Sequence, residues 1–285
     1  GAAARRSPTE SSRHVELGFH TIHFSPMFGG TAPLLDVLQA TADSGFDAVG
    51  FDLASIDAHV AAGGTVEEIV TLLADAHLRC SDVLVLAPGG GDPDVLATAR
   101  TLGALASELG TDTCIAAVAG PVPWNTLVAT LGECATVLSD DGVRLAIEFA
   151  PYSPLSSLRA ARELCEAVGW ERTGLVLDSL HFFRGETPWS ELTDLDATQI
   201  ALVQYSDAPA TAPEMLVDES RNARLIPGEG DLPLADLVTA LYAIGFDGLV
   251  SAEILSEPFR RADPAIGARR AHDALAEAWV TDAAG

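Results

Sequence analysis

Four oxygen-bearing side chains stand at the ends of hydrophobic segments in the second half of the chain. Glu148 ends R-L-A-I-E, Asp178 ends L-V-L-D, Gln204 ends A-L-V-Q and Glu253 ends V-S-A-E. Each run is typical of a buried strand, which would carry its last side chain into the protein interior. Three carboxylates that converge in an apolar interior repel one another strongly unless a positive charge compensates them. We therefore expect a cation-binding site where these strands end.

The donor atoms indicate which cation would suit such a site. Three carboxylates and one amide carbonyl form an all-oxygen set, which suits Mg²⁺ or Mn²⁺ better than Zn²⁺, a metal that favours nitrogen and sulfur. Plainer interpretations exist: a strand-end carboxylate can pair with Arg144 or Arg184, and Gln204 alone would be an ordinary hydrogen-bonded interior amide. The presence of all four donors on successive strands favours the metal site.

Two further residues could act beside such a site. His181 follows Asp178 by three positions; it is either an inert loop histidine or, as we expect, a substrate ligand and an acid–base group. Arg224 lies in R-L-I-P-G-E-G, where the proline and glycines are turn residues at the least. A functional arginine there would offer a fixed charge to a substrate oxygen. We predict catalysis by His181 and substrate binding by both residues.

Aromatic and imidazole side chains in the first half of the chain suggest pocket walls. His20 and His23 end the first apolar segment, and we weigh pocket lining and core packing equally for them. Trp124 opens a helical pattern, where it would either line the pocket or pack between helices. His20 and Trp124 complete the predicted substrate contacts.

The segments that would position these residues alternate between strand and helix patterns. One helical pattern opens at Thr65 with the capping-box sequence T-x-x-E. Eight such units predict a single (β/α)8 TIM barrel over residues 14–285, preceded by a disordered tail over residues 1–13. An open doubly wound sheet is disfavoured because no G-x-G-x-x-G follows the first strand. The expected strands are 15–24, 48–53, 80–86, 113–118, 143–149, 175–179, 201–206 and 249–254.

Composition narrows the classes of function. The net charge of −25 argues against nucleic-acid binding, and no apolar run is long enough to cross a membrane. All 16 basic residues are arginine, which excludes Schiff-base, pyridoxal-phosphate and P-loop chemistry because each needs a lysine. The four cysteines lack a C-x-x-C spacing and are expected to be buried free thiols of a cytoplasmic protein. These residues do not distinguish a monomer from a homodimer.

Five motifs in the second half of the chain carry a family resemblance. They are I-E-F-A-P-Y around Glu148, L-D-S-L-H around Asp178 and His181, V-Q-Y-S-D-A around Gln204, P-G-E-G-D-L-P-L, and G-L-V-S-A-E-I around Glu253. Together they resemble the motifs of the xylose-isomerase-like TIM-barrel superfamily, which includes sugar-phosphate isomerases, ketose 3-epimerases and inosose dehydratases. The resemblance implies a single divalent ion held by Glu148, Asp178, Gln204 and Glu253. Gln204 stands where ketose epimerases of this group usually carry histidine, and it looks more like the bacterial 3-dehydroshikimate dehydratases.

The chemistry that the superfamily shares is proton abstraction next to a carbonyl. We predict a divalent-metal-dependent isomerase or epimerase of a small hydroxy-ketone sugar or cyclitol, in which Glu148 and Glu253 exchange protons with the substrate through an enolate. The alternative is a dehydratase of a cyclic hydroxy-ketone, in which His181 protonates the departing hydroxyl. A barrel that binds a sugar or metal without turnover, as a sensor or subunit, is the alternative from a different class.

Overall fold

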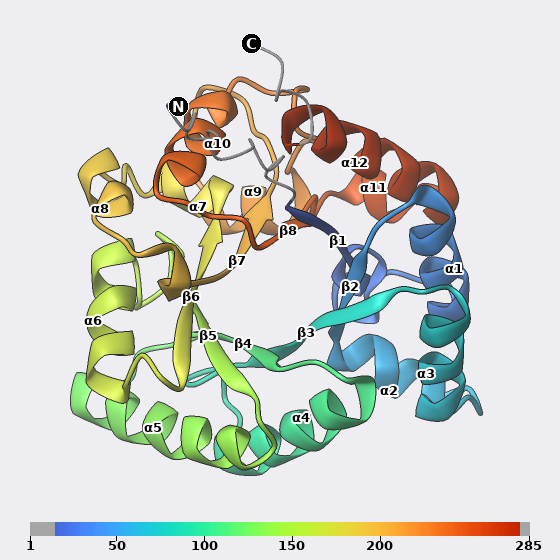
Figure 1. Ribbon diagram of the computed structural model, residues 1–285, viewed down its shortest axis with the longest axis horizontal. Helices are drawn as coiled ribbons and strands as arrows, with labels where there is room; N and C mark the ends of the chain where they lie inside the picture. The colour runs from blue at the N-terminus through green and yellow to red at the C-terminus, as the bar shows by residue number, and fades with distance from the viewer. Residues whose placement is uncertain (1–14, 280–285) are drawn as a thin grey trace, which may run out of the picture.

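Eight parallel strands pair in chain order, and the first pairs with the last, so the sheet closes into a barrel in this computed structural model (Figure 1). The structure describes residues 15–279, and the predicted tail over residues 1–13 lies outside them. The (β/α)8 prediction is confirmed. The strands are β1 (Glu16–His20), β2 (Ala48–Asp52), β3 (Arg79–Leu86), β4 (Thr113–Ala117), β5 (Arg144–Glu148), β6 (Thr173–Asp178), β7 (Ile200–Tyr205) and β8 (Leu249–Ala252).

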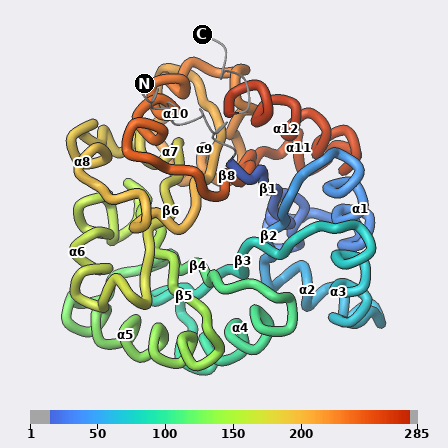
Figure 2. The backbone as a smooth tube through the Cα atoms, viewed as in Figure 1, coloured from blue at the N-terminus to red at the C-terminus, as the bar shows by residue number. Residues whose placement is uncertain are grey.

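Long helices cover the outside of the barrel, as the tube in Figure 2 shows. They are α1 (Leu34–Ser44), α3 (Val66–Asp75), α4 (Val95–Leu109), α5 (Trp124–Asp140), α6 (Leu158–Val168), α10 (Leu234–Ala243) and α12 (Pro264–Trp279). Shorter helices are α2 (Leu53–Ala61), α7 (Ser179–Arg184), α8 (Trp189–Thr193), α9 (Leu216–Asn222) and α11 (Glu257–Arg260). Within residues 15–279, no helix has the length and apolar character needed to cross a bilayer.

Side chains at strand ends shape the loops that follow. The first strand is shorter than predicted: it ends at His20, whose ring accepts the N–H of Ile22 and starts a 3₁₀ turn (Thr21–Phe24). Asp52 and Asp178 cap α2 and α7 in the same way, so these helices begin directly at the ends of β2 and β6. The capping box that the sequence predicts at Thr65 is present.

The barrel interior is layered, and the layers explain why the polar strand ends point inward. An apolar layer fills the middle of the barrel with Ala48, Leu84, Ile115, Ala146, Val176, Leu202 and Leu249. Successive side chains of a strand point to opposite faces, so residues two positions apart share a face. Glu148, Asp178 and Gln204 each follow a residue of this layer by two positions and therefore extend it towards the carboxyl ends of the strands.

A buried aspartate anchors the long segment after β7. Asp207, 1% exposed, accepts the N–H groups of Ala208, Gly228, Gly230 and Leu232 at 2.8–3.1 Å. Its own backbone pairs in both directions with Leu225. A side chain at Gly230 would meet the carbonyl oxygen of Ala208 at 2.5 Å, so only glycine fits beneath this carboxylate. The anchor fixes the position of Leu225 and hence of the neighbouring Arg224.

We predict that Asp207→Asn lowers the free energy of unfolding by about 3 kcal/mol, because an amide cannot accept four N–H groups and buried donors lose their partner. Urea denaturation of both proteins checks this. The matched control is Asp231→Asn, an exposed aspartate of the same segment that accepts one N–H, from Ala210. We expect the control to lose less than about 1 kcal/mol. Equal losses in the two variants would contradict the anchoring role.

Candidate active site at the carboxyl end of the barrel

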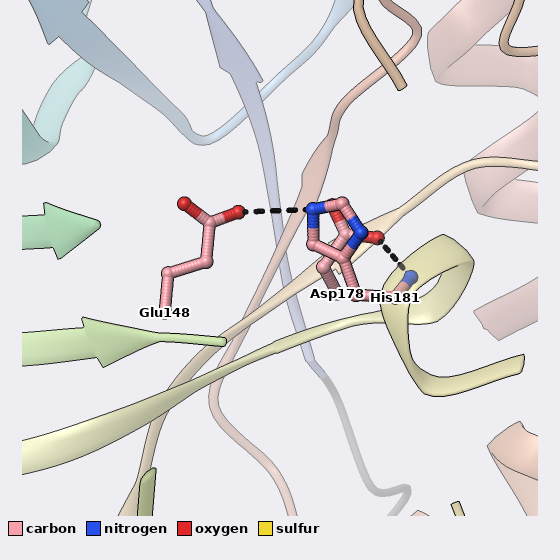
Figure 3. Close-up of side chains that lie close together, drawn as sticks. All are labelled: Glu148, Asp178 and His181. Carbon is pink, nitrogen blue, oxygen red and sulfur yellow. Dashed lines mark hydrogen bonds and ion pairs between the residues drawn. The ribbon is translucent and has the colours of Figure 1, made fainter. Parts of the chain in front are cut away.

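Glu148, Asp178 and His181 meet at the carboxyl ends of β5 and β6, as Figure 3 shows. His181 Nε2 lies 3.6 Å from Glu148 Oε1 and 3.8 Å from Asp178 Oδ2. One ligand atom from each of the three residues lies within 4.8 Å of the others. Asp178 Oδ1 also accepts the backbone N–H of His181 at 3.1 Å, so the cap of α7 places the imidazole beside the carboxylates.

The buried Asp178 carboxylate is paired with Arg224, and both residues are almost fully buried. Arg224 Nη1 donates to Asp178 Oδ2 at 2.6 Å. Its remaining donors reach the carbonyl oxygen of Ser220 at 2.7 Å, the hydroxyl of Ser220 at 3.0 Å and the hydroxyl of Ser206 at 3.3 Å. Burial raises the pKa of Asp178, but Arg224 and His181 outweigh it, and the pKa lies below its ordinary value.

The two arginines considered from the sequence as ion-pair partners lie elsewhere. Arg144 donates to the carbonyl oxygen of Thr173 at 2.5 Å. Arg184 binds both carboxylate oxygens of the buried Glu219 at 2.7 Å. Arg224 therefore supplies the charge that faces the strand-end carboxylates.

Gln204 and Glu253 complete the inward-facing set. The strand register places Gln204 beside Asp178 and Ser251. Both Gln204 and Glu253 are buried, at 2% and 4% exposure. Among the described residues, no hydrogen-bond donor reaches Gln204 Oε1 or Glu253 Oε2. Glu253 is not part of the group formed by Glu148, Asp178 and His181. The charges of the carboxylates in that group nevertheless act on it.

The pKa of Glu253 reflects its burial and the carboxylates gathered at this end of the barrel. Its pKa rises to about 8 because burial penalises the charged carboxylate, and the carboxylates of Glu148 and Asp178 add to the effect. Arg224 and His20 oppose the rise without cancelling it. Buried oxygen atoms without donors and a carboxylate pushed towards its neutral form both fit a site for a divalent cation, whose charge would satisfy them.

His20 and His23 are held by protein groups on both ring nitrogens. His20 Nδ1 accepts the N–H of Ile22 at 3.0 Å, and His20 Nε2 lies 3.2 Å from Asp82 Oδ1. Burial lowers the pKa of His20, but the nearby Asp82 carboxylate raises it by more, so the pKa lies above its ordinary value. His23 Nδ1 donates to the carbonyl oxygen of His20 at 2.6 Å, and its Nε2 accepts the N–H of Ile254 at 2.8 Å. Both rings therefore tie loops together.

The remaining sequence-predicted contact, Trp124, is 43% exposed at the start of α5. The segment with Pro227 and Gly228 forms the turn beneath Asp207, and Glu229 pairs with Arg270 on the surface. Of the residues predicted from the sequence, Glu148, Asp178 and His181 lie closest together. Trp124 is partly exposed to solvent.

Sequence reasoning assigned no role to Tyr152 or Asp82. The ring of Tyr152 stands edge-on to His181, with centroids 5.5 Å apart, and its hydroxyl lies 2.9 Å from Ser220 Oγ. Burial, with help from Glu148, raises the pKa of Tyr152. Asp82 holds His20 inside the barrel, where a side chain at Gly50 would meet both residues. An aspartate in the middle of the apolar run R-C-S-D-V-L-V-L was the available signal for Asp82.

A closed parallel barrel with acidic side chains at the carboxyl ends of its strands defines a class of (β/α)8 proteins with a polar site in the barrel mouth. Residues 38–278 match the sequence profile of the xylose isomerase-like TIM barrel family, so the chain belongs to that family. The family resemblance drawn from the sequence is therefore confirmed.

Individual relatives include enzymes of two kinds. The inosose isomerase of Halalkalibacterium halodurans is 29% identical over 155 residues, which cover 54% of each chain. The 3-dehydroshikimate dehydratase of Pseudomonas aeruginosa is 29% identical over 256 residues, which cover 82% of this chain and 37% of the relative. The chain thus spans about half, or less, of the length of these curated relatives.

Solved structures confirm the fold. The crystal structure of the IolI protein with a bound zinc atom superimposes with a TM-score of 0.83 at 19% identity, covering 93% of this chain and 98% of that one. Likeness at this level of identity establishes the shared barrel.

We predict that His23 makes stability fall as the pH drops below about 6.5. Burial lowers the pKa of His23 to about 3, from 6.5 in the unfolded chain. Between these values only the unfolded state binds the proton, so the contribution of His23 to stability is complete above the upper value and declines by up to about 1.4 kcal/mol per pH unit below it.

Urea unfolding at pH 7, 6 and 5 measures this slope in the wild type and in His23→Asn. Because Glu253, whose pKa is raised to about 8, contributes a slope of opposite sign over this range, the two proteins are compared by their difference: the slope of His23→Asn should be lower than that of the wild type by up to about 1.4 kcal/mol per pH unit. The control is His77→Asn, because His77 is exposed and its φ of 54° suits asparagine. The control should keep the slope of the wild type, and an unchanged slope in His23→Asn would refute the assignment.

Proposed function

We propose that the chain is a divalent-metal-dependent enzyme that removes a proton next to the carbonyl of a small polyhydroxy ketone. The observation that supports this most directly is the set of inward-facing oxygen donors at the carboxyl ends of β5 to β8. Two of these oxygens, on Gln204 and Glu253, are buried without a donor among the described residues. Groups of this kind are costly to bury unless a ligand engages them.

Glu148, Asp178, Gln204 and Glu253 would hold the ion. When bound, it supplies a Lewis acid for the substrate's carbonyl oxygen, which acidifies the adjacent C–H bond. The all-oxygen donor set favours Mn²⁺ or Mg²⁺. The zinc in the IolI structure makes Zn²⁺ a necessary arm of any metal assay. Arg224 keeps a fixed positive charge beside Asp178. That charge would attract a substrate oxygen.

The protein's own proton carriers face the site from different sides. Glu148 ends β5 and Glu253 follows β8, three strands further around the barrel. A substrate lying between them would meet one carboxylate on each face, so one can take a proton while the other returns it. Glu148 is 17% exposed and can reach a ligand from the open side.

His181 is suited to a separate proton transfer. Its Nε2 lies near the oxygens of Glu148 and Asp178, while its buried Nδ1 has no partner among the described residues. An imidazole held by carboxylates on one side can carry a proton to a departing hydroxyl. His181 would then act as the acid that completes the loss of water.

We favour dehydration of a cyclic hydroxy-ketone, which was the alternative in the prediction from the sequence, over the isomerase or epimerase predicted there. Gln204 stands at the position where the chain resembles bacterial 3-dehydroshikimate dehydratases, and a protein of that name matches 82% of this chain. Isomerisation of an inosose-type ketone is the second candidate, because inosose isomerases match about half of the chain. Both reactions begin with the same proton abstraction. Trp124 and His20 are kept as proposed walls of the substrate pocket.

We predict that the purified wild type binds about one divalent ion per chain and that Mn²⁺ raises its melting temperature, because a ligand that binds only the folded state stabilises it. Glu253→Gln and Glu148→Gln should weaken Mn²⁺ binding by at least about 10-fold, since each removes a charged oxygen donor. Calorimetric titration and elemental analysis measure both quantities.

The control for these variants is Glu229→Gln, which changes a surface glutamate paired with Arg270. We expect it to bind Mn²⁺ like the wild type. If the wild type binds no Mn²⁺, Mg²⁺ or Zn²⁺, the proposed function fails.

We predict that the metal-loaded enzyme converts 3-dehydroshikimate with the loss of one water, seen by mass spectrometry and by the absorbance of a more conjugated product. Exchange of one carbon-bound proton for solvent deuterium in inosose, without loss of water, would favour the isomerase instead. His181→Asn should lower dehydration by about 100-fold, because acid catalysis of the leaving group is lost. Proton exchange should persist in this variant, and its loss would contradict the division of roles.

A further inference from the structure

The phenol of Tyr152 is partly exposed at the edge of the site, and its hydroxyl contacts the buried Ser220. Tyr152 lies in the segment between β5 and α6, four residues after Glu148, and it is 39% exposed. Its ring packs edge-on against His181. Its hydroxyl oxygen lies 2.9 Å from Ser220 Oγ, and Ser220 Oγ in turn accepts a hydrogen bond from Arg224 Nη2 at 3.0 Å. The phenol is thereby linked to the charged pair inside the barrel.

The direction of these hydrogen bonds follows from the chemistry of the three groups. A guanidinium can only donate, so Ser220 Oγ must be the acceptor for Arg224. Ser220 is 2% exposed, and its own proton needs an acceptor because burying an unpaired donor is costly. Among the described contacts, the oxygen of Tyr152 is the acceptor in reach. Ser220 therefore donates to Tyr152.

This order leaves the proton of Tyr152 without an acceptor among residues 15–279. The opposite order would strand the buried Ser220 proton, whereas the half-exposed phenol can present its proton to solvent or to a ligand at little cost. Arg224, locked by Asp178 and Ser220, fixes the whole chain of groups. The proton of Tyr152 is thus available to a ligand on the open side of the site, beside His181.

We infer that Tyr152 donates a hydrogen bond to a ring oxygen substituent of the bound substrate and so helps to select a polyhydroxylated ring. This inference rests on the proposed function for the identity of the ligand. The two donors would have different roles. Arg224 would attract a substrate oxygen by its charge, whereas the neutral Tyr152 hydroxyl would bind only an acceptor that is correctly placed. Loss of such a donor costs roughly 10- to 100-fold in binding.

Two variants separate the hydroxyl from the ring. Tyr152→Phe removes the donor and keeps the aromatic edge against His181, and Tyr152→Leu removes both. The matched control is Tyr242→Phe, which deletes a phenol hydroxyl that donates to the carbonyl oxygen of Trp279 outside the barrel. The binding probes are shikimate and myo-inositol, which carry ring hydroxyls but no ketone to react, titrated calorimetrically into Mn²⁺-loaded protein. Turnover is measured separately with 3-dehydroshikimate and inosose.

We expect the wild type and Tyr242→Phe to bind at least one probe equally, and Tyr152→Phe to bind it roughly 10- to 100-fold more weakly with unchanged Mn²⁺ affinity. If Tyr152→Phe binds like the wild type and only Tyr152→Leu is weak, the ring acts by packing and the inference is overturned. Absence of binding in the wild type overturns it as well. Tyr152-dependent binding without turnover would sustain the inference while the proposed function fails.

Discussion

The buried pair of Arg224 and Asp178 organises the carboxyl end of this barrel. One guanidinium faces a cluster that includes Glu148, Asp178 and Glu253, so the carboxyl groups outnumber the arginine that compensates them. Arg224 donates its hydrogen bonds to Asp178 and two serines. Burial raises the pKa of Glu253 although the charge of Arg224 opposes the rise, and one Glu253 oxygen has no donor among the described residues. The site is thus built with a deficit of positive charge, and a divalent cation would correct that deficit.

Elements far apart in the sequence keep that pair in place. Asp207 gathers four backbone N–H groups of the segment after β7, and this segment carries Arg224 back over the barrel mouth. The cap that Asp178 forms on α7 brings His181 to the same point. An imidazole, a guanidinium and the strand-end oxygens therefore share one set of backbone constraints. Such a frame would suit the proposed reactions that begin with proton abstraction, with groups at its rim selecting among them.

Much of this arrangement was open to prediction from sequence patterns. Apolar runs that end in a carboxylate or an amide indicated parallel strands, and the period of two along each strand carried Glu148, Asp178 and Gln204 inward. The first strand was predicted too long because His20 reads as part of an apolar run, whereas its ring accepts an N–H and begins a turn. The short helices α2 and α7 were missed because their caps, Asp52 and Asp178, also read as the ends of strands.

Local sequence patterns were sufficient to predict the barrel, the inward-facing oxygen donors and the family. Strand periodicity and the residue types at strand ends depend only on a few neighbouring residues. Pairings between distant residues were decided only in three dimensions. Arg224 rather than Arg144 or Arg184 faces Asp178, His20 bonds to Asp82, and Tyr152 reaches Ser220 across 68 positions. Each of these depends on which loops the closed sheet brings together, and no local spacing specifies that choice.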